Sequence, residues 1–182
     1  MTQTLDSLIA KFYPSDPEAR RILLTHSRCV ADMALAISRR HPELHADEKF
    51  LEEAAMLHDI GITACDAPGI HCFGTLPYIA HGVEGARMLA EEGMLRHARV
   101  CERHTGSGLT AEEIEENVLP LPPRDMLPVS IEEKIICYAD KFYSKDPGRL
   151  TERKTYEEAR RSLGRHGEAP LRRFDALHDM LK

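Results

Sequence analysis

Histidines and aspartates on the apolar faces of predicted helices constrain this fold more than any other feature of the sequence. His26 lies in the middle of an apolar face that also carries Ile22 and Val30 at helical spacing. The other members of the set are His58, Asp59 at the end of the same predicted helix as His58, His81, His104 and Asp140. A buried charged group without a partner is costly, so such groups are paired, hydrogen-bonded or bound to metal. We therefore expect five helices to bring these side chains together.

Each member of the set has an ordinary explanation when it is taken alone. A histidine such as His26 can be a hydrogen-bonded core residue, and the later histidines could lie at the surface or cap the end of a helix. Asp140 could pair with Lys141 or Lys145, which follow it closely in the chain. Taken together and in this order, the residues favour a shared metal site.

The rest of the chain predicts helices almost throughout, so we expect an all-α fold. No run of residues alternates with the period of a strand, and 5% aromatic residues without Trp are atypical of a sheet protein. Asp16 and Pro17 match an N-cap and a first-turn proline, and they open a helix that runs to about Arg40. Further helices are predicted over about 47–59, 77–93 and 95–104, onward from Thr110 and from Ser130, and over roughly 151–163 and 168–181.

Two segments break this helical pattern. Gly and Pro in residues 63–71 predict a loop, and the prolines of residues 119–128 exclude a helix there. Neither break separates a second domain, and no internal repeat is present. We expect a single domain over residues 1–182, with its core at about 17–146 and a helical C-terminal extension over 151–182.

Charge and composition exclude several classes of protein. The net charge of -6 argues against a general nucleic-acid binder, and the arginines of the C-terminal region are read as a solvated face or a subunit contact. No apolar run approaches the roughly 20 residues of a membrane helix, and the first residues do not resemble a secretory signal. The five scattered cysteines are expected to be reduced, and the spacing of Cys65, His71 and Cys72 fits no common zinc pattern. We expect a cytoplasmic protein.

The order of the histidines and aspartates resembles the HD superfamily of metal-dependent phosphohydrolases. Residues His58-Asp59-Ile60-Gly61 are the literal HDIG signature of one subgroup. The other matching motifs are His26-Ser27, His81-Gly82, Arg103-His104-Thr105-Gly106 and Ala139-Asp140-Lys141, of which the second and third look like the added histidines of dinuclear members. The resemblance covers about residues 20–145 and implies an HD-domain helical bundle, in agreement with the helical pattern.

The resemblance also implies a role for each residue. A first metal ion would be held by His26, His58, Asp59 and Asp140, and a second by Asp59, His81 and His104. Asp59 would thus act in catalysis as the bridge between two divalent ions. Histidine and carboxylate ligands suit iron or manganese and do not demand zinc. Such a pair of ions would activate water to cleave a phosphate ester or anhydride of a nucleotide or another small phosphorylated substrate.

Four further residues are candidates for contact with the substrate. Lys141 follows a proposed ligand and could neutralise phosphate in catalysis, or it could simply pair with Asp140. Thr105 and Gly106 could offer hydrogen-bond donors beside His104, or form only a turn. Arg103 could reach a substrate, although a surface position is the favoured interpretation. The remaining histidines, for which surface positions are expected, are His41, His45, His71, His97, His166 and His178.

Three functions are compatible with this set of residues. A phosphohydrolase is favoured, and the ligands resemble those of bacterial enzymes that split symmetric dinucleoside tetraphosphates as well as those of monophosphatases. Ile62 directly after the signature disfavours the cyclic-dinucleotide-cleaving relatives that have Lys there. The alternatives are a mixed-valent di-iron oxygenase of the same fold and a non-catalytic nucleotide-binding regulator. We expect no nucleic-acid or membrane partner, and the sequence leaves open whether the chain forms a homo-oligomer.

Overall fold

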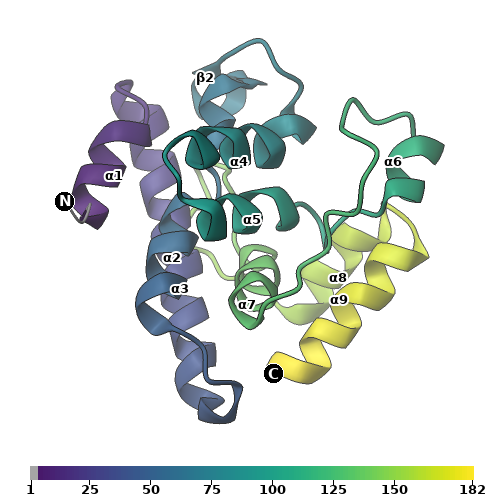
Figure 1. Ribbon diagram of the computed structural model, residues 1–182. Helices are drawn as coiled ribbons and strands as arrows, with labels where there is room; N and C mark the ends of the chain where they lie inside the picture. The colour runs from purple at the N-terminus through teal and green to yellow at the C-terminus, as the bar shows by residue number, and fades with distance from the viewer. Residues whose placement is uncertain (1–3) are drawn as a thin grey trace.

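The structure is a computed structural model that describes residues 4–182, and it confirms the all-α prediction (Figure 1). The α-helices are α1 (Leu5–Phe12), α2 (Pro17–Arg40), α3 (Glu48–Leu57), α4 (His81–Glu91), α5 (Leu95–Arg103), α6 (Ala111–Glu116), α7 (Ile131–Asp140), α8 (Tyr156–Gly164) and α9 (Glu168–Leu181). Short 3-10 helices are η1 (Pro42–Leu44), η2 (Ile60–Ala64), η3 (Pro68–Ile70) and η4 (Tyr78–Ala80). Two short strands, β1 (Asp66–Ala67) and β2 (Cys72–Phe73), form an antiparallel pair.

Side-chain caps explain why several helices begin where the sequence predicts. Asp16 accepts hydrogen bonds from the backbone N–H groups of Glu18 and Ala19, so α2 starts at Pro17. Thr110 and Glu113 form the complete reciprocal capping box of α6. Caps of this kind satisfy backbone donors that have no partner inside the helix.

At the start of α7 the expected capping box forms only in part. The hydroxyl of Ser130 accepts from the backbone N–H of Glu133, as predicted. The carboxylate of Glu133 instead accepts from the backbone of Val129 at 2.7 Å and from Arg103 at 2.9 Å. The sequence pattern therefore identified the cap residue Ser130. The expected bond from the Glu133 carboxylate to the backbone of Ser130 does not form, because Glu133 pairs with Arg103, which is distant in the chain.

Two apolar clusters make up the core, and long helix α2 contributes to both. Val30, Ala34 and Ile37 pack with residues of α3, α7, α8 and α9. Nearer its start, Ile22 and Leu23 pack with residues of α1, η2, α4 and α5. Figure 1 shows α2 and α3 side by side, α4 and α5 stacked beside them, and α8 with α9 on the far side of α7. The polar residues discussed below lie where the two clusters meet.

Glycines permit the close approach that joins η2 to α4. A Cβ atom added to Gly61 would lie 2.0 Å from the backbone oxygen of His81 and 2.3 Å from the backbone nitrogen of Gly85. A Cβ atom added to Gly82 would lie 2.6 Å from the backbone oxygen of Cys101, in α5. Any larger side chain at these positions would therefore push apart the elements that carry His58, His81 and His104.

The structure differs from the prediction in several places, and α4, for example, begins at His81 and not near residue 77. α1, which is capped by Thr4, was not predicted. The expected loop of residues 63–71 contains 3-10 turns and the first strand of a small hairpin. α8 begins at Tyr156, later than expected, and α3 ends at Leu57, so that Asp59 lies just beyond the helix. Within residues 4–182, no helix is both long enough and apolar enough to cross a bilayer.

We expect Gly61→Ala to destabilise the protein, because its new methyl group would collide with the backbone of α4. Overpacking of this kind costs about 1–3 kcal/mol, which should lower Tm by about 2–12 °C in a chain of this length. Thermal unfolding followed by circular dichroism measures the change.

Gly69→Ala is the matched control, since nothing lies within 4 Å of its added Cβ atom. Equal Tm values for the two variants would contradict the tight packing at Gly61.

Candidate metal centre

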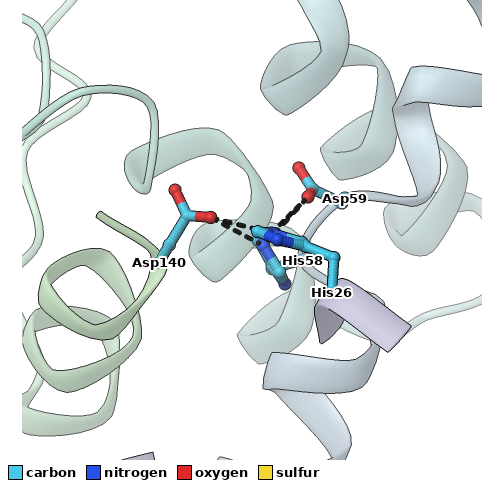
Figure 2. Close-up of side chains that lie close together, drawn as sticks. All are labelled: His26, His58, Asp59 and Asp140. Carbon is cyan, nitrogen blue, oxygen red and sulfur yellow. Dashed lines mark hydrogen bonds and ion pairs between the residues drawn. The ribbon is translucent and has the colours of Figure 1, made fainter. Parts of the chain in front are cut away.

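Four of the predicted residues form a buried group at the junction of the two apolar clusters. His26 comes from the middle of α2, His58 from the end of α3, Asp59 from the residue after it, and Asp140 from the end of α7. The Nε2 atom of His26 lies 3.2 Å from Asp59 Oδ2 and 3.0 Å from Asp140 Oδ1. The Nε2 atom of His58 lies 3.1 Å from Asp59 Oδ2 and 3.5 Å from Asp140 Oδ1. Figure 2 shows these side chains converging from separate segments.

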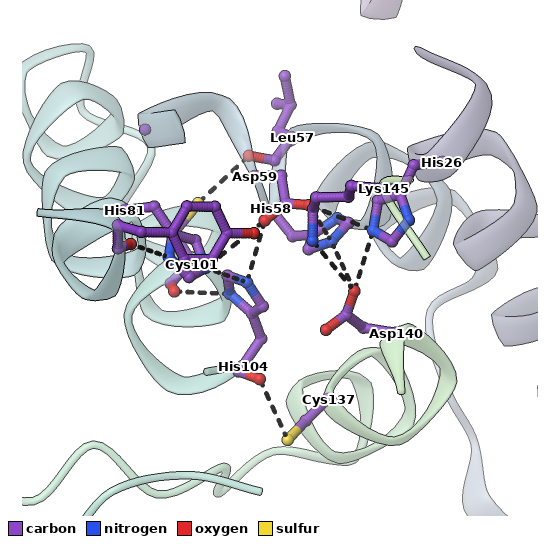
Figure 3. A network of polar contacts seen from close by, with 12 residues as sticks. His26, Leu57, His58, Asp59, His81, Cys101, His104, Cys137, Asp140 and Lys145 are labelled. Atoms are coloured by element: carbon purple, nitrogen blue, oxygen red, sulfur yellow. Dashed lines mark hydrogen bonds and ion pairs between the residues drawn. The ribbon is translucent and has the colours of Figure 1, made fainter. Parts of the chain in front are cut away.

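A second buried group contains the other two predicted histidines and again Asp59. His81 is the first residue of α4, and His104 follows the last residue of α5. Their Nε2 atoms lie 3.1 Å apart, and they are 3.6 Å and 3.3 Å, respectively, from Asp59 Oδ1. The six predicted ligands therefore lie in one continuous network (Figure 3).

Asp59 belongs to both groups through different oxygen atoms. Its Oδ2 faces His26 and His58, whereas its Oδ1 faces His81 and His104. Its backbone has φ -109° and ψ 6°, in the sparsely populated region between helix and strand that often contains active-site residues. The turn after α3 thus places one carboxylate between two sets of histidines.

Three of the histidines are held so that the same ring nitrogen points inward. The Nδ1 atoms of His58, His81 and His104 donate to backbone carbonyl oxygens three residues earlier, at 2.6, 2.7 and 2.7 Å. Because a carbonyl oxygen only accepts, each Nδ1 carries a proton, and in a neutral ring Nε2 is left as an unprotonated lone pair. This orientation by a backbone carbonyl is typical of histidines that bind metal.

The buried nitrogen and oxygen atoms of the two groups are better placed to bind metal ions than to form hydrogen bonds with one another. His58 Nε2 and both carboxylate oxygens of Asp59 are buried and have no hydrogen-bond partner of acceptable geometry among residues 4–182. Donor atoms bonded to one ion at about 2.1 Å lie about 3.0–3.4 Å from each other in octahedral or tetrahedral geometry. The observed separations of 3.0–3.6 Å are close to this range. The atoms are therefore arranged to surround shared cations.

Burial and charge act together on the protonation of the histidines. Burial and the neighbouring His104 lower the pKa of His81 to about 3, and burial also lowers the pKa of His104. Burial alone would lower the pKa of His58 too, but the Asp59 and Asp140 carboxylates outweigh it and raise that pKa to about 9. The second group thus has neutral imidazoles, while the first holds a proton that a cation could replace.

Lys145 also belongs to this network, although the sequence suggested it only as a salt-bridge partner of Asp140. Its Nζ atom lies 2.8 Å from Asp59 Oδ2 and 3.7 Å from Asp140 Oδ1, and its side chain is 15% exposed. Burial would lower the pKa of Lys145, but Asp59, Tyr78 and Asp140 raise it well above its usual value. Lys145 follows α7 in an irregular segment, where no helical spacing could have indicated that it points inward.

The candidate substrate residues occupy three different environments. Lys141 pairs with Asp140 at 2.6 Å and donates to the backbone oxygen of His104 at 3.0 Å. It therefore links the end of α7 to the residue that follows α5. Arg103 is directed to Glu133, at 2.9 Å. Thr105 and Gly106 line a cavity next to His104.

The other six histidines do not join either group. His45, His71 and His166 are exposed, as expected. The surface prediction was wrong for His41, His97 and His178, which are partly buried. Their partners explain this: His97, for example, packs edge-on against Phe50, with ring centroids 4.8 Å apart. Within residues 4–182, no third group of metal-ligand atoms forms, and all five cysteines are free.

Comparison with known proteins gives a family match and several relatives. The model of the HD domain matches residues 23–144. An uncharacterized protein of Methanocaldococcus jannaschii is 38% identical over 120 residues, which cover 65% of this chain and 62% of that one. Two tRNA (cytidine(56)-2'-O)-methyltransferases, from Picrophilus torridus and Thermoplasma volcanium, are 31% and 33% identical over 148 and 140 residues. No solved structure matches the chain significantly.

The matches cover only part of these relatives. The shared segment is 76% of this chain in both methyltransferase comparisons, but 39% and 35% of those proteins. Their names therefore describe proteins that extend far beyond the shared segment.

We expect the wild-type protein to bind two metal ions per chain and the double variant His81→Ala/His104→Ala to bind one. The variant removes two of the three donors of the second group and leaves the first group complete. Asp59→Ala should lose both ions, because both groups share Asp59. Metal analysis of purified, metal-loaded protein gives the stoichiometry.

The exposed His45 provides the control, since His45→Asn should retain both ions. Two ions in the double variant would place the second metal elsewhere.

Proposed function

This chain belongs to the HD domain family, and on that premise we propose that it is a metal-dependent phosphohydrolase that acts on a nucleotide or another small phosphorylated substrate. The observation that carries this proposal is the pair of buried ligand groups joined by Asp59. Two divalent ions held close together suit phosphoryl chemistry, because they can grip phosphate oxygens and the attacking oxygen at once.

In the proposed mechanism the protein residues mainly hold the metal ions in position and balance the charges of the site. His26, His58 and Asp140 would complete the first site with Asp59, and His81 and His104 the second. Iron or manganese suits these nitrogen and oxygen donors. When bound, the ions would supply an activated water and compensate the charge that grows on the phosphoryl group. The backbone carbonyls that hold Nδ1 keep the imidazole lone pairs aimed at the ions.

Lys145 and Lys141 adjust the charge of this site. The formal charges of the two buried carboxylates, Asp59 and Asp140, are matched by those of the two ammonium groups. With two divalent ions added, the site has a positive net charge, which favours an anionic substrate. We propose that Lys145, which is slightly exposed and is paired with Asp59 through its side chain, turns from Asp59 towards a substrate phosphate. Lys141, anchored on the backbone of His104, would stay in place and act only on Asp140.

A small substrate agrees with the overall charge of the chain. With a net charge of -6, positive potential would be concentrated at the metal centre and not spread over a surface for nucleic acid. We propose that the protein acts on small molecules in the cytoplasm. Methyl transfer to tRNA, named for two of the relatives, is not part of this proposal, because the shared segment is the smaller part of those proteins.

We expect manganese- or iron-loaded protein to release phosphate from at least one member of a panel of nucleotides and other phosphate esters, including symmetric dinucleoside tetraphosphates. Chelation should abolish the release, and Asp59→Ala should lower it to background, because both sites share that carboxylate. Phosphate release and product chromatography measure the activity.

A panel left untouched by fully metal-loaded protein would contradict hydrolysis. Substrate-dependent oxygen uptake by the ferrous-loaded protein would then indicate the oxygenase alternative, and nucleotide binding without turnover would indicate a regulator.

We expect Lys145→Met to lower kcat/KM about 100-fold while two metal ions remain bound, because removal of one charge that stabilises a transition state typically has an effect of this size. Lys145→Arg should recover part of the activity, since it restores the positive charge. Lys49→Met, at an exposed position of α3, is the control. Loss of metal from Lys145→Met would show that Lys145 supports the ligands and does not contact the substrate.

A further inference from the structure

A cavity of about 440 Å3 lies where the second half of α2, α7 and the end of α9 meet the segment that leads into α8. We call it the cationic pocket and define it by Arg40, Tyr138, Arg153, Lys154, Tyr156 and His178. Its lining includes none of the six ligand residues, and neither Lys141 nor Lys145. The proposed metal centre therefore does not account for this pocket.

The charged side chains that line the cationic pocket are all basic. They are Arg40, Arg153, Lys154 and Lys182, and among residues 4–182 no carboxylate side chain lines the pocket. Lys182 pairs with Asp179 at 2.9 Å. The other three cations form no ion pair with a carboxylate within the described part of the chain. A cavity lined by charges of one sign concentrates ions of the opposite sign, so this pocket attracts anions although the whole chain has a net charge of -6.

Lys154 is the partly buried member of these cations, whereas the others are exposed. Its backbone N–H donates to the carbonyl oxygen of Phe142 at 2.8 Å, which holds the residue against the end of α7. Burial lowers the pKa of Lys154, and nearby cations lower it further against the opposing effect of Asp140. An anion bound in the pocket would therefore stabilise an ammonium group that the protein itself leaves poorly compensated.

Aromatic side chains form much of the remaining wall. The rings of Tyr156 and His178 are stacked, with centroids 3.7 Å apart and planes inclined by 16°. The hydroxyl of the buried Tyr138 lies 2.7 Å from Nδ1 of His178, which fixes both side chains. The ring of Phe142 packs 4.8 Å from that of Tyr138, and the guanidinium group of Arg153 lies 5.5 Å from the centre of the Phe142 ring. Aromatic rings and cations thus line the same cavity.

We propose that the cationic pocket binds a small aromatic molecule that carries an oxyanion group. The planar guanidinium groups of Arg40 and Arg153 can each donate two hydrogen bonds to such a group. The ring of the ligand would pack against the aromatic wall, as aromatic side chains pack against one another. A volume of about 440 Å3 lies within the range of pockets for small organic ligands.

Calorimetric titration of the metal-loaded protein with 2-naphthalenesulfonate, the neutral 2-naphthalenemethanol and methanesulfonate tests this proposal. Sulfonates are weak metal ligands, so their binding reports on the pocket and not on the metal centre. We expect 2-naphthalenesulfonate to exceed both other compounds in affinity by about tenfold or more, a difference of about 1.4 kcal/mol. The alcohol lacks the charge, and methanesulfonate lacks the ring.

Two variants of exposed residues locate the binding site. Arg153→Gln should weaken the binding of 2-naphthalenesulfonate about tenfold and leave that of 2-naphthalenemethanol unchanged, because it removes a hydrogen bond between charged groups. Arg40→Gln should act in the same direction, and it replaces Arg153→Gln if that variant does not fold. Arg99→Gln is the matched control, since Arg99 is an exposed cation of α5 outside the pocket.

Each part of the proposal can fail by itself. Equal affinities for 2-naphthalenesulfonate and 2-naphthalenemethanol would overturn the recognition of charge, and equal affinities for the two sulfonates would overturn the aromatic wall. Unchanged binding in Arg153→Gln and Arg40→Gln would overturn the location, and equal weakening in Arg99→Gln would reduce the effect to the general charge of the protein. All of these measurements concern binding without turnover, so their results are independent of the hydrolase proposal.

Discussion

The carboxylate of Asp59 is the interaction on which the rest of the structure depends. Its two oxygens face two different pairs of histidines, so four chain segments must bring their side chains within 3.6 Å of this carboxylate. That requirement explains the turn directly after α3 and the absence of a side chain at Gly61, where any Cβ atom would collide with α4. It also explains why the apolar core is divided into two clusters with polar residues between them. The fold is organised around a polar centre that apolar packing alone would not produce.

Buried charge of this kind needs compensation, and the structure supplies it from two directions. Lys141 and Lys145 approach Asp140 and Asp59 from the C-terminal side, while the histidines surround Asp59 from the other helices. The desolvation cost of the carboxylates is offset only while these partners stay in place. Cations bound by the histidine and aspartate donors would add a positive excess at this site, which suits the phosphate group of the proposed substrate. Stability and chemistry therefore depend on the same charges.

The segment that matches the HD domain model ends before the last two helices of the chain. The ligands stand on α2, α3, α4, α5 and α7, within the segment that matches the HD domain model. A cavity of about 340 Å3, which Thr105 lines, takes part of its wall from α8 and from the connection to α9, beyond residue 144. The family match therefore covers the helices that bring the six residues together, and it leaves out part of the wall of this cavity.

Within residues 4–182, the sequence predicted every α-helix except α1, the caps of α2 and α6, and the six histidines and aspartates that the structure brings together. Helical periodicity and capping are local, so an inward-facing histidine such as His26 can be recognised from its neighbours in the chain. Three features became visible only in the packed structure. Lys145 lies beside Asp59, Arg103 pairs with Glu133, and residues 105–119 line a cavity together with the C-terminal helices. These features lie in irregular segments or depend on contacts between residues far apart in the chain. No local sequence pattern predicts such contacts, because they form only when the helices pack together.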